Sequence, residues 1–296
     1  LAASAAIVLP AKAADVTVAV TAIVEHPSLD ATRDGVKDAL AEAGYKEGEG
    51  LTFVYQSAQG NPATAAQIAR QFIAPICDRG LTPVVVVSAF DWATDKLSQL
   101  AACISPDPSL REYARLLMSG ELRANAALSI TLEAIGMAAR SLTGREAGIV
   151  TDRGPVDGVI CRIHKGHILE LLERKIIPVV AGFQGYYYDS NEQRDEVSIL
   201  GRGGSNLTAV ALADALSQPD CVMLSNVDGI YDKDPEAFDD AEKLDEISAD
   251  ELLEWKPFPR VIQREAVEYA VKHGVDIWIR SGFDATLPGT LIRCRI

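Results

Sequence analysis

Short, continuous apolar runs alternate with segments of helical periodicity along most of this chain. The run at 83–89, PVVVVSA, is almost entirely apolar, as expected for a parallel strand that is buried on both faces. Further strands are predicted at 147–151, 176–181, 221–225 and 275–280, and helices at 109–140 (with a break near Ser119-Gly120), 162–174, 205–217, 247–256 and 262–273. This alternation indicates an α/β fold built on a parallel sheet.

The first 75 residues show the same alternation but begin differently. Residues 1–14 are a small-residue apolar run ending in Ala11-Lys12-Ala13, which resembles the end of a secretory signal peptide, although a plain apolar terminus would look the same. Strands are predicted at 16–24 and 51–56, and helices at 29–44 and 61–74, the latter with Asn61 as N-cap and Pro62 in its first turn. These four elements predict a βαβα segment.

Charge and cysteine usage argue against several classes of protein. The formal net charge is −14 and no basic stripe is visible, so a nucleic-acid-binding surface is not expected. The five cysteines are scattered without CxxC or Cys/His spacing, which predicts reduced, mostly buried thiols and no zinc site. No apolar run is long enough to span a membrane.

A glycine-rich loop carries the strongest local signal for chemistry. Gly201-Arg202-Gly203-Gly204-Ser205-Asn206 stands directly before a predicted helix. Glycines let backbone amides approach a phosphate closely, and the helix N-terminus adds a partial positive charge. The same residues would also suit a tight strand-to-helix turn capped by Ser205, so the flanking motifs decide between the two interpretations.

Two resemblances to known families divide the chain. Residues 15–75, which include AVTAIVEHPSLDATRDGVKDALAEAGYKEG and YQSAQGNPATAAQIARQF, resemble the opening of ABC-transporter periplasmic substrate-binding proteins. Residues 78–292 resemble the catalytic domain of aspartokinases, within the amino acid kinase family. The motifs that carry this second resemblance, in order, are VVVVSA at 84–89, SLTGREAGIVTD at 141–152, PVVAGFQG at 178–185, ILGRGGSNLTAVALADAL at 199–216, NVDGIYDKDP at 226–235, KLDEIS at 243–248 and PGTLI at 288–292.

The aspartokinase resemblance implies a fold, a reaction and a set of site residues. The implied fold is a three-layer α/β/α sandwich. The implied reaction moves the γ-phosphoryl of ATP, with Mg²⁺, onto the side-chain carboxylate of L-aspartate in lysine, threonine and methionine biosynthesis. The implied substrate-binding residues are Thr94, Glu121, Arg202 and Ser205. The implied ATP-binding residues are Gly203, Gly204, Ser225, Asn226, Asp228, Tyr231 and Arg260, and the implied catalytic residues are Arg202, Asn206 and Arg260.

Each of these assignments has a plainer alternative. Glu121, implied to hold the substrate ammonium, could be an ordinary glutamate on a helix surface, and VDGIYDKDP could be a simple cluster of turns. The chain also departs from the family pattern. It lacks a Lys-Phe-Gly-Gly strand, and Asn206, Ser225, Asn226, Glu236 and Arg260 replace the usual residues. These changes predict weakened phosphate binding, and an inactive fusion remnant or a small-ligand binding module stays an alternative to aspartate kinase.

The predicted organisation has three parts. Residues 1–14 are a signal-like remnant, residues 15–76 a substrate-binding-protein-like fragment, and residues 77–296 an aspartokinase-like catalytic domain without the family's ACT domains. The use of ATP and the unpaired pattern of cysteines favour the cytoplasm. A homodimer is an expectation that comes from the family alone.

Overall fold

The computed structural model describes residues 16–22, 51–57, 62–89, 93–201, 203–235, 237–238 and 240–295. The chain divides into two compact units, 1–61 and 62–296. In the first unit, β1 (Val16–Ala22) pairs in parallel with β2 (Leu51–Ser57), from Val16 opposite Leu51 to Ala22 opposite Ser57. Both predicted strands are therefore confirmed, whereas the helix predicted at 29–44 and the Asn61 N-cap lie outside the described residues.

The second unit begins with a helix that changes its pitch. It runs through α2 (Pro62–Ile68), a π-helical stretch η1 (Ala69–Ile73) and α3 (Ala74–Asp78). The amide of Ala74 bonds to the carbonyl of Ala69, five residues earlier. Because Pro75 has no amide hydrogen for the normal bond, the wider turn lets the helix continue past the predicted end at residue 74.

A three-stranded parallel sheet forms the centre of this unit, in the order β3 (Val85–Val87), β7 (Ile177–Ala181), β4 (Ala139–Leu142). Every residue of β7 is buried. Ile177 and Val179 pack with η1 and the end of α5 (Leu110–Ala134), while Val180 packs in a second cluster that includes residues of α6 (Gly166–Glu173) and α7 (Gly204–Ala215). Helices therefore cover both faces of the sheet, as its apolar strands predict.

Helix α5 is continuous, so the break predicted near Ser119-Gly120 is wrong. Gly120 is buried, and a Cβ atom there would lie 2.9 Å from the Cβ of Ala89. Glycine in a helix costs only about 1 kcal/mol, and here its missing side chain lets the chain after β3 approach α5. Ser109 caps α5, with its hydroxyl accepting from the amide of Glu112.

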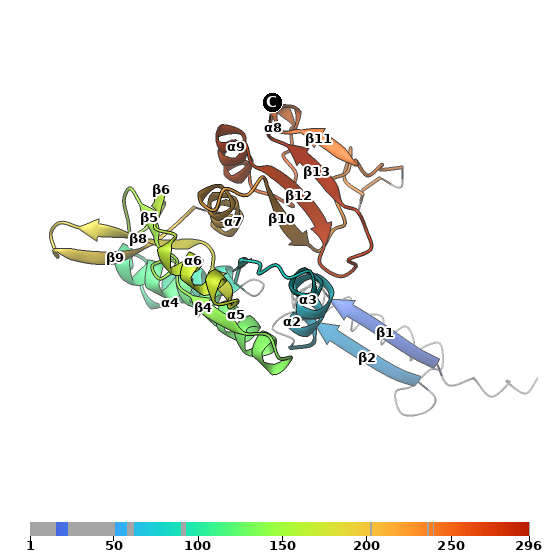
Figure 1. The fold of residues 1–296 in the computed structure, drawn as a ribbon, viewed down its shortest axis with the longest axis horizontal. Coiled ribbons are helices and arrows are strands. Elements are labelled where there is room, and N and C mark those ends of the chain that lie inside the picture. The colour runs from blue at the N-terminus through green and yellow to red at the C-terminus, as the bar shows by residue number, and fades with distance from the viewer. Residues whose placement is uncertain are drawn as a thin grey trace, which may run out of the picture. The chain divides into compact units, whose positions relative to one another are not determined.

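Two further sheets complete the unit (Figure 1). One has the order β6 (Ile160–Ile163), β5 (Ile149–Thr151), β8 (Gln184–Asp189), β9 (Arg194–Ile199). The other has the order β10 (Asp220–Ser225), β12 (Asp276–Ser281), β13 (Thr290–Arg293), β11 (Glu246–Ser248). The helices not yet named are α4 (Ala93–Ile104), α8 (Ala249–Glu254) and α9 (Arg264–His273).

Three other expectations need correction or restriction. The helix predicted at 162–174 begins only at Gly166, because Ile163 pairs with Ile149 of β5 as part of strand β6. The thiols are free but not mostly buried, since Cys103 and Cys161 are exposed and only Cys294 is fully buried. None of the described helices is both long enough and apolar enough to cross a membrane.

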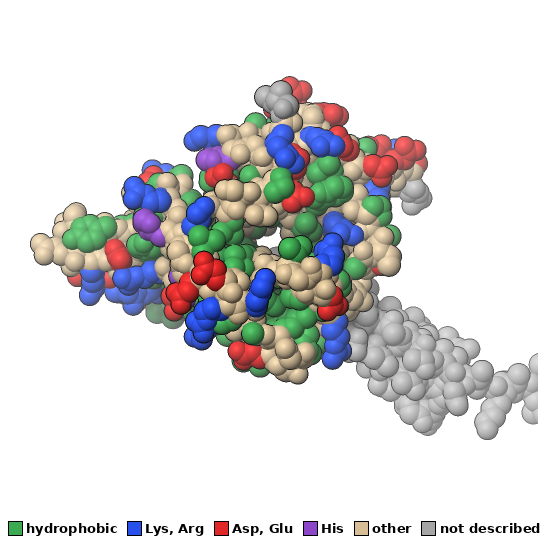
Figure 2. Space-filling model, viewed as in Figure 1, with side chains coloured by type: hydrophobic (Ala, Val, Ile, Leu, Met, Phe, Trp, Pro, Cys, Tyr) green, Lys and Arg blue, Asp and Glu red, His purple; other side chains and the backbone are tan. Residues whose placement is uncertain are grey.

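Charges on the surface are mixed. On the face in Figure 2, lysine and arginine side chains alternate with aspartate and glutamate and do not gather into a stripe.

Candidate active site

The glycine-rich loop joins β9 to α7 in a conformation that requires glycine. Gly203 has a φ of +76°, in the left-handed region, and directly precedes α7. Gly204 is buried, and a Cβ atom there would lie 2.6 Å from the Cβ of Leu200. The carbonyl of Gly203 accepts from the amide of Asn206 at 3.0 Å, which starts the helix. Arg202, predicted to contact substrate and phosphate, lies outside the described residues.

The ends of two parallel strands meet this loop. The amide of Gly182, just after β7, donates to the carbonyl of Val87 at the end of β3, at 2.9 Å. A Cβ atom on Gly182 would lie 2.7 Å from the hydroxyl of Ser205, so the loop packs directly on the strand end. Ligands of open α/β sheets bind at the carboxyl ends of the strands, and Ser205 lies at this edge, where its substrate contact stays a prediction.

Glu121 is a buried carboxylate beside the same strand ends. It is only 2% exposed, which rules out the alternative of a helix-surface glutamate. Its Oε1 accepts from the amide of Ala89, which follows β3, at 3.2 Å, and its Oε2 has no partner among the described residues. Burial raises the pKa of Glu121 to about 7, against the opposing effect of its backbone hydrogen bonds. A buried carboxylate oxygen without a partner is suited to a cationic ligand.

Thr94 lies close by in the chain. It is half-buried in the first turn of α4. A Cβ atom on Gly120 would lie 3.7 Å from the Cβ of Ala93, so the start of α4 packs beside the residue before Glu121. The fold thus brings the start of α4 to the Glu121 region of α5.

Side-chain hydrogen bonds fix the predicted nucleotide-binding segment, residues 226–235. The hydroxyl of Tyr231 donates to Oδ1 of Asp228 at 2.8 Å, and the ammonium of Lys243 donates to Oδ2 at 3.1 Å. Burial alone would raise the pKa of Asp228, but these hydrogen bonds hold it below its usual range. Tyr231 and Lys243 also form an antiparallel β-bridge. Lys243 was not predicted as a site residue, although it begins the KLDEIS motif.

Ser225 is the last residue of the neighbouring strand β10, and Asn226 follows it. The hydroxyl of Ser225 donates to the side-chain oxygen of Asn226 at 3.1 Å, and the carbonyl of Ser225 accepts from the amide of Gly282 at 2.7 Å. Val210 of α7 and Ile230, beside Tyr231, belong to one core cluster. Helix α7 therefore connects the glycine loop to the nucleotide segment through packing.

Arg260 stands in the turn before α9, exposed and without a partner among the described residues. The turn reaches the glycine loop through Gln263, because a Cβ atom on Gly203 would lie 1.6 Å from the Cγ of Gln263. A free guanidinium three residues from this contact is available to an anion that binds at the loop. Gln263 is a second contact that the sequence did not indicate.

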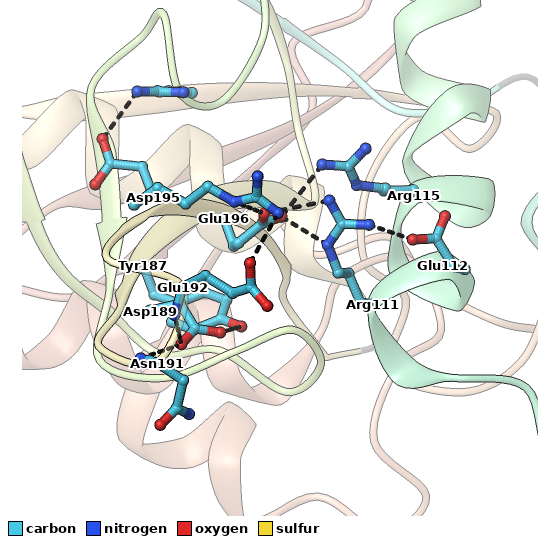
Figure 3. A network of polar contacts seen from close by, with 11 residues as sticks. Arg111, Glu112, Arg115, Tyr187, Asp189, Asn191, Glu192, Asp195 and Glu196 are labelled. Atoms are coloured by element: carbon cyan, nitrogen blue, oxygen red, sulfur yellow. Dashed lines mark hydrogen bonds and ion pairs between the residues drawn. The ribbon is translucent and has the colours of Figure 1, made fainter.

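A charged network supports the strand that leads into the loop (Figure 3). Glu196 of β9 is 3% exposed and pairs with Arg111 at 3.0 Å, Arg194 at 2.7 Å and Arg115 at 3.2 Å. The hydrogen bond from Arg111, then that from Arg115 and the charges of Arg111 and Arg194, lower the pKa of Glu196 to about 2 although burial opposes this. Because Arg111 and Arg115 belong to α5, the network fastens β9 to the helix that carries Glu121.

The described residues contain no group of three or more His, Cys, Asp or Glu side chains that could hold a metal ion. Magnesium in phosphoryl-transfer sites is commonly held by one or two carboxylates together with substrate phosphates. A metal bound in that way would need only one or two carboxylates from the protein.

Two family models match parts of the chain. A model of the amino acid kinase family matches residues 57–290, and one of ABC transporter substrate binding proteins matches residues 17–85. An aspartokinase of Corynebacterium glutamicum is 40% identical over 210 residues, which are 71% of this chain and 49% of the relative. The chain thus spans about half the length of that relative.

Solved structures extend the comparison to the fold. The crystal structure of aspartate kinase from Synechocystis is 37% identical, with a TM-score of 0.69, over 80% of this chain and 38% of that one. Aspartokinase III of E. coli, in complex with aspartate and ADP, shares the fold at 19% identity and a TM-score of 0.58, over 95% of this chain and 64% of that one. The amino acid kinase-like α/β fold predicted from the motifs is therefore confirmed, and the chain belongs to the amino acid kinase family.

Proposed function

We propose that this chain is an aspartate kinase, which transfers the γ-phosphoryl group of ATP to the side-chain carboxylate of L-aspartate. The observation that carries the proposal is the buried Glu121, whose Oε2 has no partner among the described residues and which lies beside strand ends that contact the glycine loop. A carboxylate in that environment suits the ammonium group of an amino acid, while the loop suits a phosphate.

Each part of the site has a role in this reaction. Glu121 holds the substrate ammonium, and Thr94 and Ser205 contact the substrate. The glycine loop, with Gly203 and Gly204, lies against the phosphates, and Arg260 supplies positive charge over the transferring group. Phosphoryl transfer needs alignment and charge more than covalent chemistry from the protein, so a set of positioned donors is sufficient for the step.

The nucleotide occupies the side of the site formed by β10 and the segment that follows it. Ser225, Asn226, Asp228 and Tyr231 form its wall, with Asp228 held by Tyr231 and Lys243. The E. coli aspartokinase III structure holds aspartate and ADP, which supports these two ligand classes for the shared fold. Magnesium, bound with ATP, would neutralise phosphate charge.

A carboxylate introduced at position 206 of the glycine-loop motif gives the sharpest test of activity. The purified protein is mixed with ATP, Mg²⁺ and L-aspartate, and the acyl phosphate is trapped with hydroxylamine. We expect hydroxamate from the natural protein and more from Asn206→Asp, because an aspartate there would organise the cations around the phosphates. No hydroxamate from either protein at high enzyme concentration would contradict the proposal and leave an inactive remnant.

The domain division, location and assembly are part of the same proposal. We assign catalysis to residues 77–296 and place the protein in the cytoplasm, where ATP is available, as a homodimer. The compact second unit begins earlier, at Pro62. Deleting residues 1–61 rather than 1–76 is therefore the variant that should keep α2, η1 and α3 with the catalytic unit and preserve ADP binding.

A further inference from the structure

Thr208 lies inside the junction between the glycine loop and strand β7. Its side chain is fully buried, in the second turn of α7. The hydroxyl donates to the carbonyl of Gly204 at 2.8 Å and accepts from the amide of Phe183 at 3.2 Å. One hydroxyl thus bonds both to the first residue of the helix and to the chain just beyond β7.

Phe183 is held in a backbone conformation that phenylalanine rarely adopts. Its φ is +66°, in the left-handed region. Its amide bonds to the hydroxyl of Thr208, and its carbonyl accepts from the amide of Leu200 at 2.8 Å, so both of its backbone groups are tied. Such strain persists only where the surroundings hold the residue in place, and Thr208 supplies one of the two bonds that do so.

The two tied segments are those that shape the candidate phosphate site. Leu200 precedes Gly201 in the chain, and a Cβ atom on Gly204 would lie 3.1 Å from the ring of Phe183. A shift of Phe183 would therefore move the wall against which Gly204 packs. The amide of Gly204 donates to the carbonyl of Gly201 at 3.0 Å, so the amide of Gly203 is the candidate phosphate donor. It can bind a phosphate only if this wall keeps the loop in place.

We infer that Thr208 is a positioning residue, whose hydroxyl fixes the glycine loop against the end of β7 and so sets the affinity for nucleotide phosphates. The inference rests on the proposed function for the identity of the ligand, a nucleotide. The hydrogen bonds of the Thr208 hydroxyl to Gly204 and Phe183 are a property of the fold alone. Valine has nearly the shape of threonine without the hydroxyl, and it would leave the buried amide of Phe183 without an acceptor.

The test compares Thr208→Val with Thr208→Ser, which keeps the hydroxyl, and with Thr131→Val as a matched control. The hydroxyl of Thr131 makes the same bond within its helix, to the carbonyl of Ala127 at 2.8 Å, but α5 there is far along the chain from the loop. Calorimetry measures binding of ADP with Mg²⁺, and amide hydrogen exchange follows a peptide that spans 181–207.

We expect Thr208→Val to weaken ADP binding about tenfold, the loss of one buried hydrogen bond, and to speed exchange in that peptide. Thr208→Ser should bind within about twofold of the natural protein, as should Thr131→Val. Unchanged amide exchange in Thr208→Val would overturn the inference. Equal losses of ADP affinity in the serine and valine variants would also overturn it, because the effect would then come from packing and not from the hydroxyl.

A failure of the proposed function can be distinguished from a failure of this inference, because the two are decided by different measurements. If the natural protein binds no nucleotide, the aspartate kinase assignment fails, while the exchange measurement still decides whether the hydroxyl holds the loop. If Thr208→Val does not fold, Thr208→Ser tests the inference instead. Because serine keeps the hydroxyl, the peptide 181–207 should then exchange at nearly the rate of the natural protein, and faster exchange would overturn the inference.

Discussion

The amide of Ala89 donates a hydrogen bond to Oε1 of Glu121 at 3.2 Å, which joins the chain after β3 to the middle of α5. This bond uses one oxygen of the carboxylate and leaves the other for a ligand. Loss of Glu121 should therefore affect the amino acid more than the nucleotide. We expect Glu121→Gln to raise the KM for aspartate at least tenfold with little change in the KM for ATP, as steady-state kinetics would show.

Glu121 should also give the free protein a pH-dependent stability. Its pKa is raised from 4.5 to about 7 in the folded state. Between these values the folded protein holds a proton that the unfolded chain has released, so the free energy of unfolding falls as the pH rises through this window. Urea unfolding at pH 5 and pH 7.5 should show this fall, and Glu121→Gln should reduce it. An identical pH dependence in both proteins would contradict the assignment.

Glu196 should give the protein a stability that falls when the pH is lowered, the reverse of the effect of Glu121. Its pKa is lowered from 4.5 to about 2, so its contribution is present at neutral pH and is lost as the pH falls from about 4.5 towards 2. Glu196→Gln should cost about 2 kcal/mol at pH 7, because three arginines lose a shared partner but keep contact with water. Asp195→Asn is the control, since its pair with Arg145 at 2.9 Å is more exposed and should contribute under about 1 kcal/mol. Equal losses in the two variants would show that burial of Glu196 adds nothing.

Gly203 should tolerate no side chain, for two separable reasons. Alanine there would adopt a left-handed φ and would collide with Gln263. Gly274 has a similar φ of +68°, but its nearest neighbour, the Cγ of Arg295, would be 3.6 Å from a Cβ atom. Gly274→Ala should therefore cost about 1 kcal/mol of stability and Gly203→Ala about 2–3 kcal/mol. Thermal unfolding measures both, and Gln263→Ala in the Gly203→Ala background should recover the difference.

Arg260 should increase kcat for phosphoryl transfer through its positive charge. Removing a positive charge over the transferring group commonly costs about 100-fold in kcat, and we expect a loss of that order for Arg260→Ala. Arg260→Lys keeps the charge and should retain a larger share of the rate. Arg174→Ala removes another exposed arginine, paired with Glu170 at 3.6 Å, and serves as the control that should leave the rate unchanged. A normal rate in Arg260→Ala would remove Arg260 from the site.

The parts of the fold that the sequence predicted are those decided by apolar patterns. The run PVVA within β7 is buried on both faces, and the strands predicted at 176–181, 221–225 and 275–280 are present. The helix predicted at 109–140 instead ends at Ala134, the last two residues of that range belong to strand β4, and helix α4 was not predicted. The hairpin of β8 and β9 was missed because its sequence, QGYYYDSNEQRDEVSI, is largely polar. Two of the three arginines that pair with the buried Glu196, Arg111 and Arg115, lie more than 80 positions earlier in the chain.

The site was predicted as a set of positions rather than as a geometry. The motifs proposed Glu121 and the glycine loop as site positions, but Glu121 accepts its hydrogen bond from Ala89, which is 32 residues away. The role of Lys243 depends on Asp228, and that of Thr208 on Phe183. A local pattern predicts a helix or strand, whereas these bonds depend on which segments the folded chain places side by side.

Strand β10 carries a consequence for the behaviour of the protein in solution. It pairs with β12 on one side and with no described strand on the other, and Val222 and Leu224 on it are 52% and 37% exposed. An apolar edge strand with free amides and carbonyls is a template for a strand of another molecule. Self-association at high concentration is therefore expected to start at this short segment in spite of the net charge of −14, and Val222→Lys is the change that should keep concentrated protein monodisperse.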